Sequence, residues 1–227
     1  MNPKKFLDIV SGESERTKNT LKKKKPDQAI LDFYARHDQI VDAVIKNSNA
    51  NIACQSGCSF CCYLKVETKP IEIIAIIQHI EKNFSADEIS NVLKKAKQNV
   101  EEFKLLDYST QVATNQACPF LNQDRCSIYE VRPAKCRNNH ATDVSLCQKC
   151  FDNPTDNTIP SSYYKPLDLA VNGLVEGFES VLKDEKYDST AYDINHAFIA
   201  AFNNPKFKKR YLKRKKTLIK QNSNSPA

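Results

Sequence analysis

Nine cysteines are the residues of this chain best suited to chemistry, and four of them fall in the nine-residue run CQSGCSFCC. That run holds Cys54, Cys58, Cys61 and Cys62, and the other five are Cys118, Cys126, Cys136, Cys147 and Cys150. Neighbours such as Cys61 and Cys62 do not close an ordinary disulfide without strain, because each disulfide needs a Cα separation of several ångströms. Thiolates joined by short loops can instead converge on one metal, so the pattern favours a metal centre.

The expected compartment supports this interpretation. The N-terminal sequence MNPKKFLDIVSGESERTKNT interrupts its apolar stretch after a few residues and lacks the hydrophobic region of a secretory signal. No window approaches the roughly 18 apolar residues of a membrane span. The sequence therefore predicts a cytoplasmic protein without a membrane span. In a reducing cytosol, dense cysteines indicate metal binding or catalysis more often than disulfides, and an odd count of nine fits disulfides poorly.

Charge is concentrated at the two ends of the 227-residue chain. Residues 1–25 carry eight Lys or Arg against three acids, and residues 206–227 carry nine against none, so 26–205 is net −7 within an overall +7. We expect a basic flexible N-terminal segment at 1–25, a single helical domain at 26–205 with its cysteine-cluster region at about 50–150, and a basic C-terminal tail at 206–227. The acidic body argues against nucleic acid as a partner, although the basic tails leave that open.

Helical periodicity dominates the central part of the chain. Amphipathic stripes predict five helices, at 26–47, 70–84, 85–106, 165–184 and 188–204. Ser85 and Glu88 have the spacing of a capping box at the start of the third. Only four glycines and little β-branched alternation leave room for no more than a short strand or hairpin near 63–68. The predicted fold class is mainly α, with an irregular cysteine-rich metal-binding region packed against about five helices.

The region between the third and fourth predicted helices, 107–165, has little periodicity and holds the five later cysteines. A stretch of this length rarely stays ordered without an internal constraint, and a bound metal would provide one. We expect most of residues 11–25, and residues 221–227, to be disordered, because they are polar and contain few apolar residues.

The motifs in this order resemble the YkgJ-like cysteine-cluster family, a zinc- or iron-chelating domain of the CxxCxxCC type. The shared elements are Cys-x3-Cys-x2-Cys-Cys at 54–62, CPFL at 118–121 and CSIYEVRPAKCR at 126–137. The resemblance covers about residues 50–150 and implies zinc or iron as the cofactor, with iron either mononuclear or in a [4Fe-4S] cluster. The ligands that it implies are Cys54, Cys58, Cys61, Cys62, Cys118, Cys126 and Cys136.

Cys147 and Cys150 form a Cys-x2-Cys half-site outside the surest part of that resemblance. With them the thiols number nine, which allows two four-thiolate sites and one remainder. His140 lies between Cys136 and Cys147 and is a candidate for a mixed site. A partly buried thiolate centre needs positive charge nearby, for which the candidates are Arg125, Arg132, Lys135 and Arg137, with Arg132 preferred.

These residues indicate metal binding more clearly than they indicate what the protein does with the metal. The leading interpretation is a metal-chelating protein whose metal is structural or is handled by the protein. One alternative is an iron-sulfur oxidoreductase or a cluster-dependent methylase, since related clusters occur in proteins similar to flagellin lysine N-methylases. A second is a nucleic-acid-associated module that uses the basic tails. The spacing of Cys54, Cys58 and Cys61 also occurs in radical S-adenosylmethionine enzymes, but those need a β/α barrel that this sequence does not predict. No phosphate-binding loop or His-Glu-x-x-His pair is present, and no catalytic residue is assigned.

Overall fold

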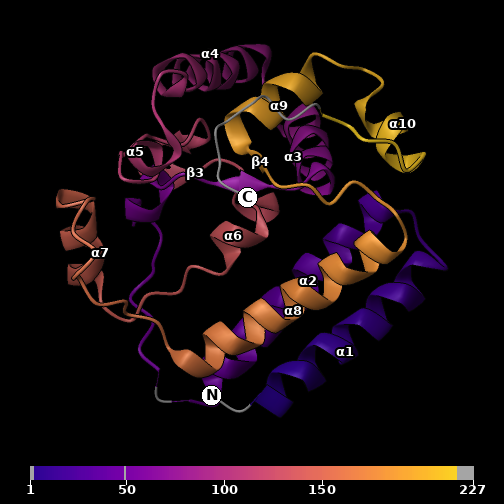
Figure 1. Cartoon of the computed structure of the whole chain (residues 1–227), viewed down its shortest axis with the longest axis horizontal. Coiled ribbons are helices and arrows are strands. Elements are labelled where there is room, and N and C mark those ends of the chain that lie inside the picture. Colours follow the sequence, from indigo (N-terminus) through magenta and orange to yellow (C-terminus); the bar gives the residue numbers. More distant parts are fainter. Residues whose placement is uncertain (1–2, 49, 219–227) are drawn as a thin grey trace.

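The structure, a computed structural model, describes residues 3–48 and 50–218 and is mainly helical (Figure 1). Its α-helices are α1 (Pro3–Leu21), α2 (Pro26–Lys46), α3 (Pro70–Asn83), α4 (Ala86–Phe103), α5 (Tyr108–Val112), α6 (Ala134–Arg137), α7 (Val144–Asp152), α8 (Lys165–Asp184), α9 (Ile194–Phe202) and α10 (Phe207–Leu212). Two short 3-10 helices are η1 (Phe60–Tyr63) and η2 (Tyr129–Val131). The strands are β1 (Glu67–Thr68), β2 (Leu121–Asn122), β3 (Arg125–Cys126) and β4 (Tyr192–Asp193).

All five predicted amphipathic helices are present as α2, α3, α4, α8 and α9. Proline occupies the first turn of α2, α3 and α8, where its missing N–H removes no helical hydrogen bond. The capping box of α4 is confirmed, because Ser85 Oγ accepts from the Glu88 N–H at 3.3 Å while Glu88 accepts from the Ser85 N–H at 2.8 Å. Local sequence signals therefore set the start of α2, α3, α4 and α8 to within one residue, whereas α9 begins at Ile194 and not at residue 188 as predicted.

The expectation of disorder at 11–25 is wrong, because α1 runs to Leu21 and packs along α8. Its buried face is polar: Glu13 and Thr17 are 1% and 0% exposed. Glu13 accepts hydrogen bonds from Arg36 on α2 at 3.1 and 2.5 Å and from Thr17 at 2.9 Å. Since α1 is anchored by polar groups, it lacks the apolar stripe that periodicity analysis detects.

The core lies around α3, whose Ile73, Ile76 and Ile80 are 0% exposed. Helix α3 contacts α2 on one side and α9 on the other, and α9 in turn packs on α4. Figure 1 shows α1, α2 and α8 running alongside one another, with α3, α4, α9 and α10 above them in the view. The Phe33 and Phe178 rings of α2 and α8 stack at 4.3 Å in this core. The cysteine-bearing segments lie beside this helical framework and are connected to it in sequence by α2 before them and α8 after them.

Strand content is low, as predicted. Strand β1 falls inside the region where a strand was expected and pairs antiparallel with β4, which leads directly into α9. Strands β2 and β3 form a separate two-stranded hairpin inside the 107–165 region. That region is ordered by short elements and by hydrogen bonds to other parts of the chain, described below.

The described residues of the basic C-terminal segment pack against the rest of the protein. Phe207 and Tyr211 of α10 are 3% and 0% exposed. Lys208 forms an ion pair with Asp27 at 2.6 Å, and Arg214 forms one with Glu185 at 3.1 Å. The expected disorder at 221–227 lies outside the described residues. None of the described helices is both long enough and apolar enough to cross a bilayer.

Candidate metal centre

Backbone hydrogen bonds bring the first and second cysteine segments together. The Cys118 N–H donates to the Cys62 carbonyl at 2.8 Å, and the Gln116 N–H donates to the Tyr63 carbonyl at 3.0 Å. These two bonds run 116–118 alongside the end of η1, which carries Cys61 and Cys62. Thiols that are far apart in the sequence thus become neighbours through main-chain pairing.

The β2–β3 hairpin returns the chain to the same place. Leu121 pairs with Cys126, and the Leu121 N–H donates to the Cys118 carbonyl at 3.0 Å. The two turn residues, Gln123 and Asp124, both have positive φ, at 48° and 58°, as a tight primed hairpin turn requires. Ser59 Oγ donates to the Asp124 carboxylate at 2.8 Å and ties this turn to the residue before η1. Cys126 is therefore held beside Cys118 and η1.

Arg137 anchors Cys136, the preceding residue, to α2. Its side chain is 1% exposed and donates to the Asp38 carboxylate at 2.6 and 2.8 Å. The guanidinium also donates to the Arg132 carbonyl at 3.2 Å and to the Glu130 carbonyl, and it lies 4.1 Å from the centre of the Tyr34 ring. A buried arginine held by carboxylate, carbonyls and an aromatic ring fixes the short helix α6 in one position.

Glu72 of α3 holds the other end of α6. Its carboxylate is 5% exposed and accepts from the Ala134 N–H at 2.7 Å. It also accepts from Thr68 Oγ1 at 3.0 Å and from the Lys69 N–H at 2.8 Å, so one side chain joins α6 to β1 and α3. After α6, Asn138 pairs with His37 at 2.8 Å and with Asn172 at 3.0 Å. Asp38, Glu72 and Asn138 position a cysteine segment, yet no motif in the sequence marks them for that role.

The first cysteine of the run, Cys54, lies apart from η1. Its Sγ accepts from the Ala141 N–H at 3.3 Å, and the Ala53 N–H donates to the Ala141 carbonyl at 2.8 Å. Ala141 also bridges to Tyr163 near the start of α8. Cys54 is therefore attached to the segment that follows α6, on the side that leads to α7.

Helix α7 carries Cys147 and Cys150 three residues apart, so both lie on one face. Phe151 packs against the rings of Tyr63 at 5.0 Å and Phe60 at 5.7 Å. Its carbonyl accepts from Asn115 Nδ2 at 2.6 Å. These contacts dock α7 on η1 and bring the Cys-x2-Cys pair to the run that begins at Cys54.

The mutual effects of the thiols on pKa divide them into two groups. The inner group is Cys61, Cys62, Cys118, Cys126 and Cys136. Burial, with smaller contributions from the nearby thiolates of Cys126 and Cys61, raises the pKa of Cys118 to about 12. Burial likewise raises the pKa of Cys136 well above its ordinary value, with added contributions from Cys118, Cys126 and Cys61. These five thiols are close enough for each ionisation to oppose the next.

The outer group is Cys54, Cys58, Cys147 and Cys150. Burial raises the pKa of Cys147 to about 11, and the thiolates of all three other members raise it as well. Burial also raises the pKa of Cys54, with added effects from Cys61 and Cys58. Cys54 and Cys150 are exposed, so this group is more accessible than the inner one.

Cys61 lies between the groups. Its thiolate acts on Cys118, Cys126 and Cys136 of the inner group and on Cys54 and Cys147 of the outer group. A hydrogen bond with the Cys62 thiol lowers the pKa of Cys61 to about 7, while the pKa of Cys62 is raised by the same bond. The Arg132 guanidinium contributes to the lowered pKa of Cys61 and also lowers the pKa of Cys126.

Arg132 thus places positive charge near the thiols, as expected, although it makes no ion pair with Asp124 or Glu130 within the described residues. It stacks on the Tyr129 ring at 3.7 Å and donates to the Tyr129 carbonyl at 2.8 Å. Arg137 also lowers the pKa of Cys126. Lys135 instead lines a cleft on another side of α6.

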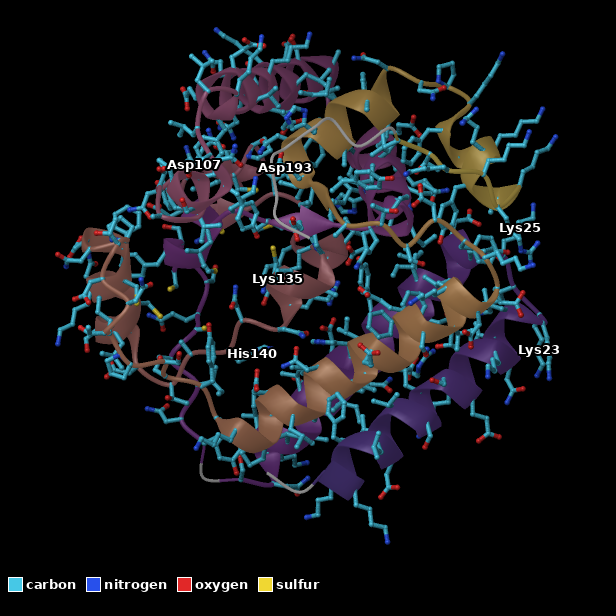
Figure 2. All side chains as sticks on the ribbon, in the orientation of Figure 1. Lys23, Lys25, Asp107, Lys135, His140 and Asp193 are labelled. Carbon is cyan, nitrogen blue, oxygen red and sulfur yellow. The ribbon has the colours of Figure 1, made fainter. Side chains whose placement is uncertain are left out.

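The donor set suits a thiophilic metal. All nine cysteines are free thiols. In the part of the chain that the structure describes, no three His, Cys, Asp or Glu side chains are placed so that they could hold one ion together. The cysteine segments are thus brought near one another, but their thiols do not converge on a single position in this structure. His140, labelled in Figure 2, hydrogen-bonds to the Arg137 backbone, and its buried Nε2 has no hydrogen-bond partner among the described residues.

Comparison with known families agrees with this chemistry. Residues 53–160, a segment that contains every cysteine but no part of α1 to α2 or α8 to α10, match the CxxCxxCC family model, described as "Putative zinc- or iron-chelating domain". No curated protein and no solved structure matches the chain significantly. Residues 53–160, slightly less than half of the chain, are therefore similar to the CxxCxxCC domain, whose description names zinc or iron as the chelated metal.

Proposed function

We propose that the protein binds zinc or iron through two adjacent thiol centres, one formed by the inner group and one by the outer group. The observation that carries the proposal is the packing of the cysteine segments. Main-chain pairing brings η1, Cys118 and strand β3 together, whereas the docking of α7 on η1 brings Cys147 and Cys150 to the run that begins at Cys54. Each group contains enough thiols for one tetrahedral metal or one cluster. Two four-thiolate centres leave one cysteine over. That cysteine is Cys61 or Cys62, unless Cys61 bridges the two centres.

Charge and burial support a metal in these groups. The raised pKa values of Cys118, Cys126 and Cys136 mean that the metal-free thiols keep their protons at neutral pH. A bound metal supplies the positive charge that stabilises thiolates, and so it displaces those protons. Arg132 offsets part of the remaining negative charge. Metal affinity is therefore expected to increase with pH across the neutral range.

We assign different roles to the two centres. The inner group joins η1, the β2–β3 hairpin and α6. Hydrogen bonds from Arg137 to Asp38 and between Asn138 and His37 connect α6 to α2, and Glu72 connects it to α3. A metal there is structural. The outer group joins two segments that are held mainly by the packing of Phe151, and two of its four thiols are exposed. A metal there can exchange with solvent, which suits a site from which the protein delivers or senses metal. His140 can replace one thiol in either centre.

Two double variants test this division, and each serves as the control for the other. Cys118→Ser/Cys126→Ser removes two inner ligands, and Cys147→Ser/Cys150→Ser removes two outer ligands. We expect each variant to lose about half of the metal of the wild-type protein, measured by inductively coupled plasma mass spectrometry. The inner variant should also unfold at a lower temperature, because it loses the structural metal. In the wild-type protein, a chelator should remove one half of the metal faster than the other.

The opposite pattern would refute the assignment. If the Cys147→Ser/Cys150→Ser variant retains all of the metal, α7 is not part of a centre. If either variant loses all metal while it keeps a wild-type circular dichroism spectrum, the nine thiols form one shared centre and the division into two groups is wrong.

A further inference from the structure

A cleft of about 440 Å³ opens between α5, α6, α8 and the chain that leads into β1. None of the nine cysteines lines it, although Leu64 on one wall follows Cys62 by two residues and Lys135 on another directly precedes Cys136. Figure 2 labels Lys135 on α6, near the middle of the molecule. The volume lies within the range of roughly 300–1,000 Å³ typical of small-molecule sites. The cleft is therefore large enough for a ligand and borders both cysteine segments.

One wall of the cleft is apolar and exposed. Leu64, Tyr108 and Val112 line it, and their exposed fractions are 49%, 39% and 49%. They come from two separate segments, the end of η1 and α5, yet they gather at one place. Large apolar side chains that stay exposed together, and not singly, indicate a surface that covers an apolar group of a ligand.

The charged side of the cleft carries one unused charge of each sign. Lys65 pairs with Asp193 at 3.2 Å and Lys69 pairs with Glu179 at 3.1 Å, so these two cations are neutralised. Within the described residues, Lys135 and Glu67 form neither an ion pair nor a side-chain hydrogen bond, and both are exposed. They lie on α6 and β1, which contact each other. A ligand that satisfies both needs an anionic and a cationic group.

We propose that this cleft binds a zwitterionic α-amino acid with an apolar side chain. The ammonium of Lys135 binds the ligand carboxylate, and the carboxylate of Glu67 binds the ligand ammonium. Leu64, Tyr108 and Val112 cover the apolar side chain. A simple organic anion fits less well, because Glu67 would repel it and stay unpaired. This proposal concerns a separate cleft and does not depend on which metal the thiols bind.

Titration with L-phenylalanine, followed by ¹H–¹⁵N NMR of the full chain, tests the proposal. L-phenylalanine methyl ester lacks the carboxylate and N-acetyl-L-phenylalanine lacks the ammonium, so both should bind more weakly to the wild-type protein. Lys135→Gln should weaken L-phenylalanine roughly three- to tenfold and abolish the preference over the ester. Glu67→Gln should abolish the preference over the N-acetyl compound. Val112→Asp should remove binding of all three.

Matched controls lie away from the cleft. Lys94→Gln on α4 changes an exposed lysine without a partner in the described structure, and Leu105→Asp changes an apolar residue that is 91% exposed. Both should bind L-phenylalanine like the wild-type protein. The proposal is overturned if the wild-type protein shows no saturable shifts at the cleft with millimolar L-phenylalanine. It is also overturned if the ester and the N-acetyl compound bind as well as the free amino acid.

Discussion

The guanidinium of Arg137 lies 2.6 and 2.8 Å from the carboxylate oxygens of Asp38, and this ion pair joins the cysteine segment of α6 to the helical framework at α2. Arg137 is 1% exposed at its side chain, whereas Asp38 is 51% exposed. Loss of this ion pair would therefore leave a buried charge on Arg137, whereas Asp38 would remain solvated. A side chain next to a proposed ligand is fixed by a partner on a distant helix.

Asp38→Ala should lower the free energy of unfolding by about 1–3 kcal/mol, because it leaves the buried Arg137 without its carboxylate. It should also weaken metal retention, since α6 carries Cys136. The matched control is Asp42→Ala, one turn further along α2, where the aspartate is exposed and has no partner in the described structure. Urea unfolding and metal analysis of both variants check the prediction. Equal behaviour of the two variants would show that the ion pair does not hold α6.

Gly177→Ala should detach α1 from α8. A Cβ at Gly177 would lie 2.5 Å from the Val10 carbonyl oxygen and 2.9 Å from Glu13 Cβ, so the helices would have to move apart. Overpacking of this kind costs about 1–3 kcal/mol. Gly12→Ala is the control, because nothing lies within 4 Å of its added Cβ, and it should stabilise α1 by about 0.5–1 kcal/mol. Thermal unfolding of both variants should show shifts of opposite sign; a shift of the same sign for both would contradict the observed packing.

The fold could be predicted from the sequence where local patterns decide it. Helices such as α2 and α4 have apolar stripes, prolines and capping residues that act within a few positions. Helix α1 was missed because its fully buried side chains, Glu13 and Thr17, are polar, and apolar contacts such as that of Ile9 with α8 at Gly173 do not give it an apolar stripe that stands out in the sequence. Whether 26–205 forms a unit separate from the two basic ends stays a prediction, although α1 and α10 both pack on it.

The candidate site divides in the same way. Residue type and spacing identify cysteines as the donors, because thiol chemistry is a property of the residues themselves. Their division into two groups depends on the hairpin at Gln123 and Asp124 and on the docking of Phe151, which are long-range contacts. The sequence favoured Arg132 as the cation near the thiols, and it does act on Cys61 and Cys126. The sequence did not show that Arg137 is buried and fixes α6, because its partner Asp38 lies on a helix far away in the chain. Spacing alone does not reveal such a partner.

His37 should make stability fall in acid. Burial lowers its pKa to about 4 from the ordinary 6.5, so the unfolded chain binds a proton in this interval that the native protein does not. The free energy of unfolding should therefore fall as the pH drops from about 6.5 to 4, by on the order of 3 kcal/mol. His37→Gln keeps a donor for Asn138 but does not titrate, so it should flatten this part of the profile.

His196→Gln on α9 is the control for that profile and should keep the wild-type slope, because His37 is still present. Unfolding by urea at a series of pH values gives all three curves. A His37→Gln profile that is parallel to the wild-type profile between pH 4 and 6.5 would show that the ring is not held neutral by burial.

Cys61 should be the most reactive of the inner thiols in metal-free protein at neutral pH. Its pKa is lowered to about 7 by the hydrogen bond with Cys62, whereas burial raises the pKa of Cys118 to about 12. Because the thiolate is the reactive form, iodoacetamide should modify Cys61 well before Cys118 or Cys136. Time-resolved peptide mass spectrometry gives the order of modification. Simultaneous modification of Cys61 and Cys118 would contradict the order, and Cys62→Ser should slow the reaction at Cys61.

The most direct test of the central claim is the metal content of the full-length protein purified without oxygen, with acid-labile sulfide assayed in the same sample. We predict stoichiometric zinc or iron, with about two zinc ions in a colourless protein, or iron with matching sulfide in a brown one. Either result identifies the metal, and its loss in the double cysteine variants then places it on the thiols. A folded, monodisperse protein that contains neither metal and in which all nine thiols react with Ellman's reagent under native conditions would contradict the account.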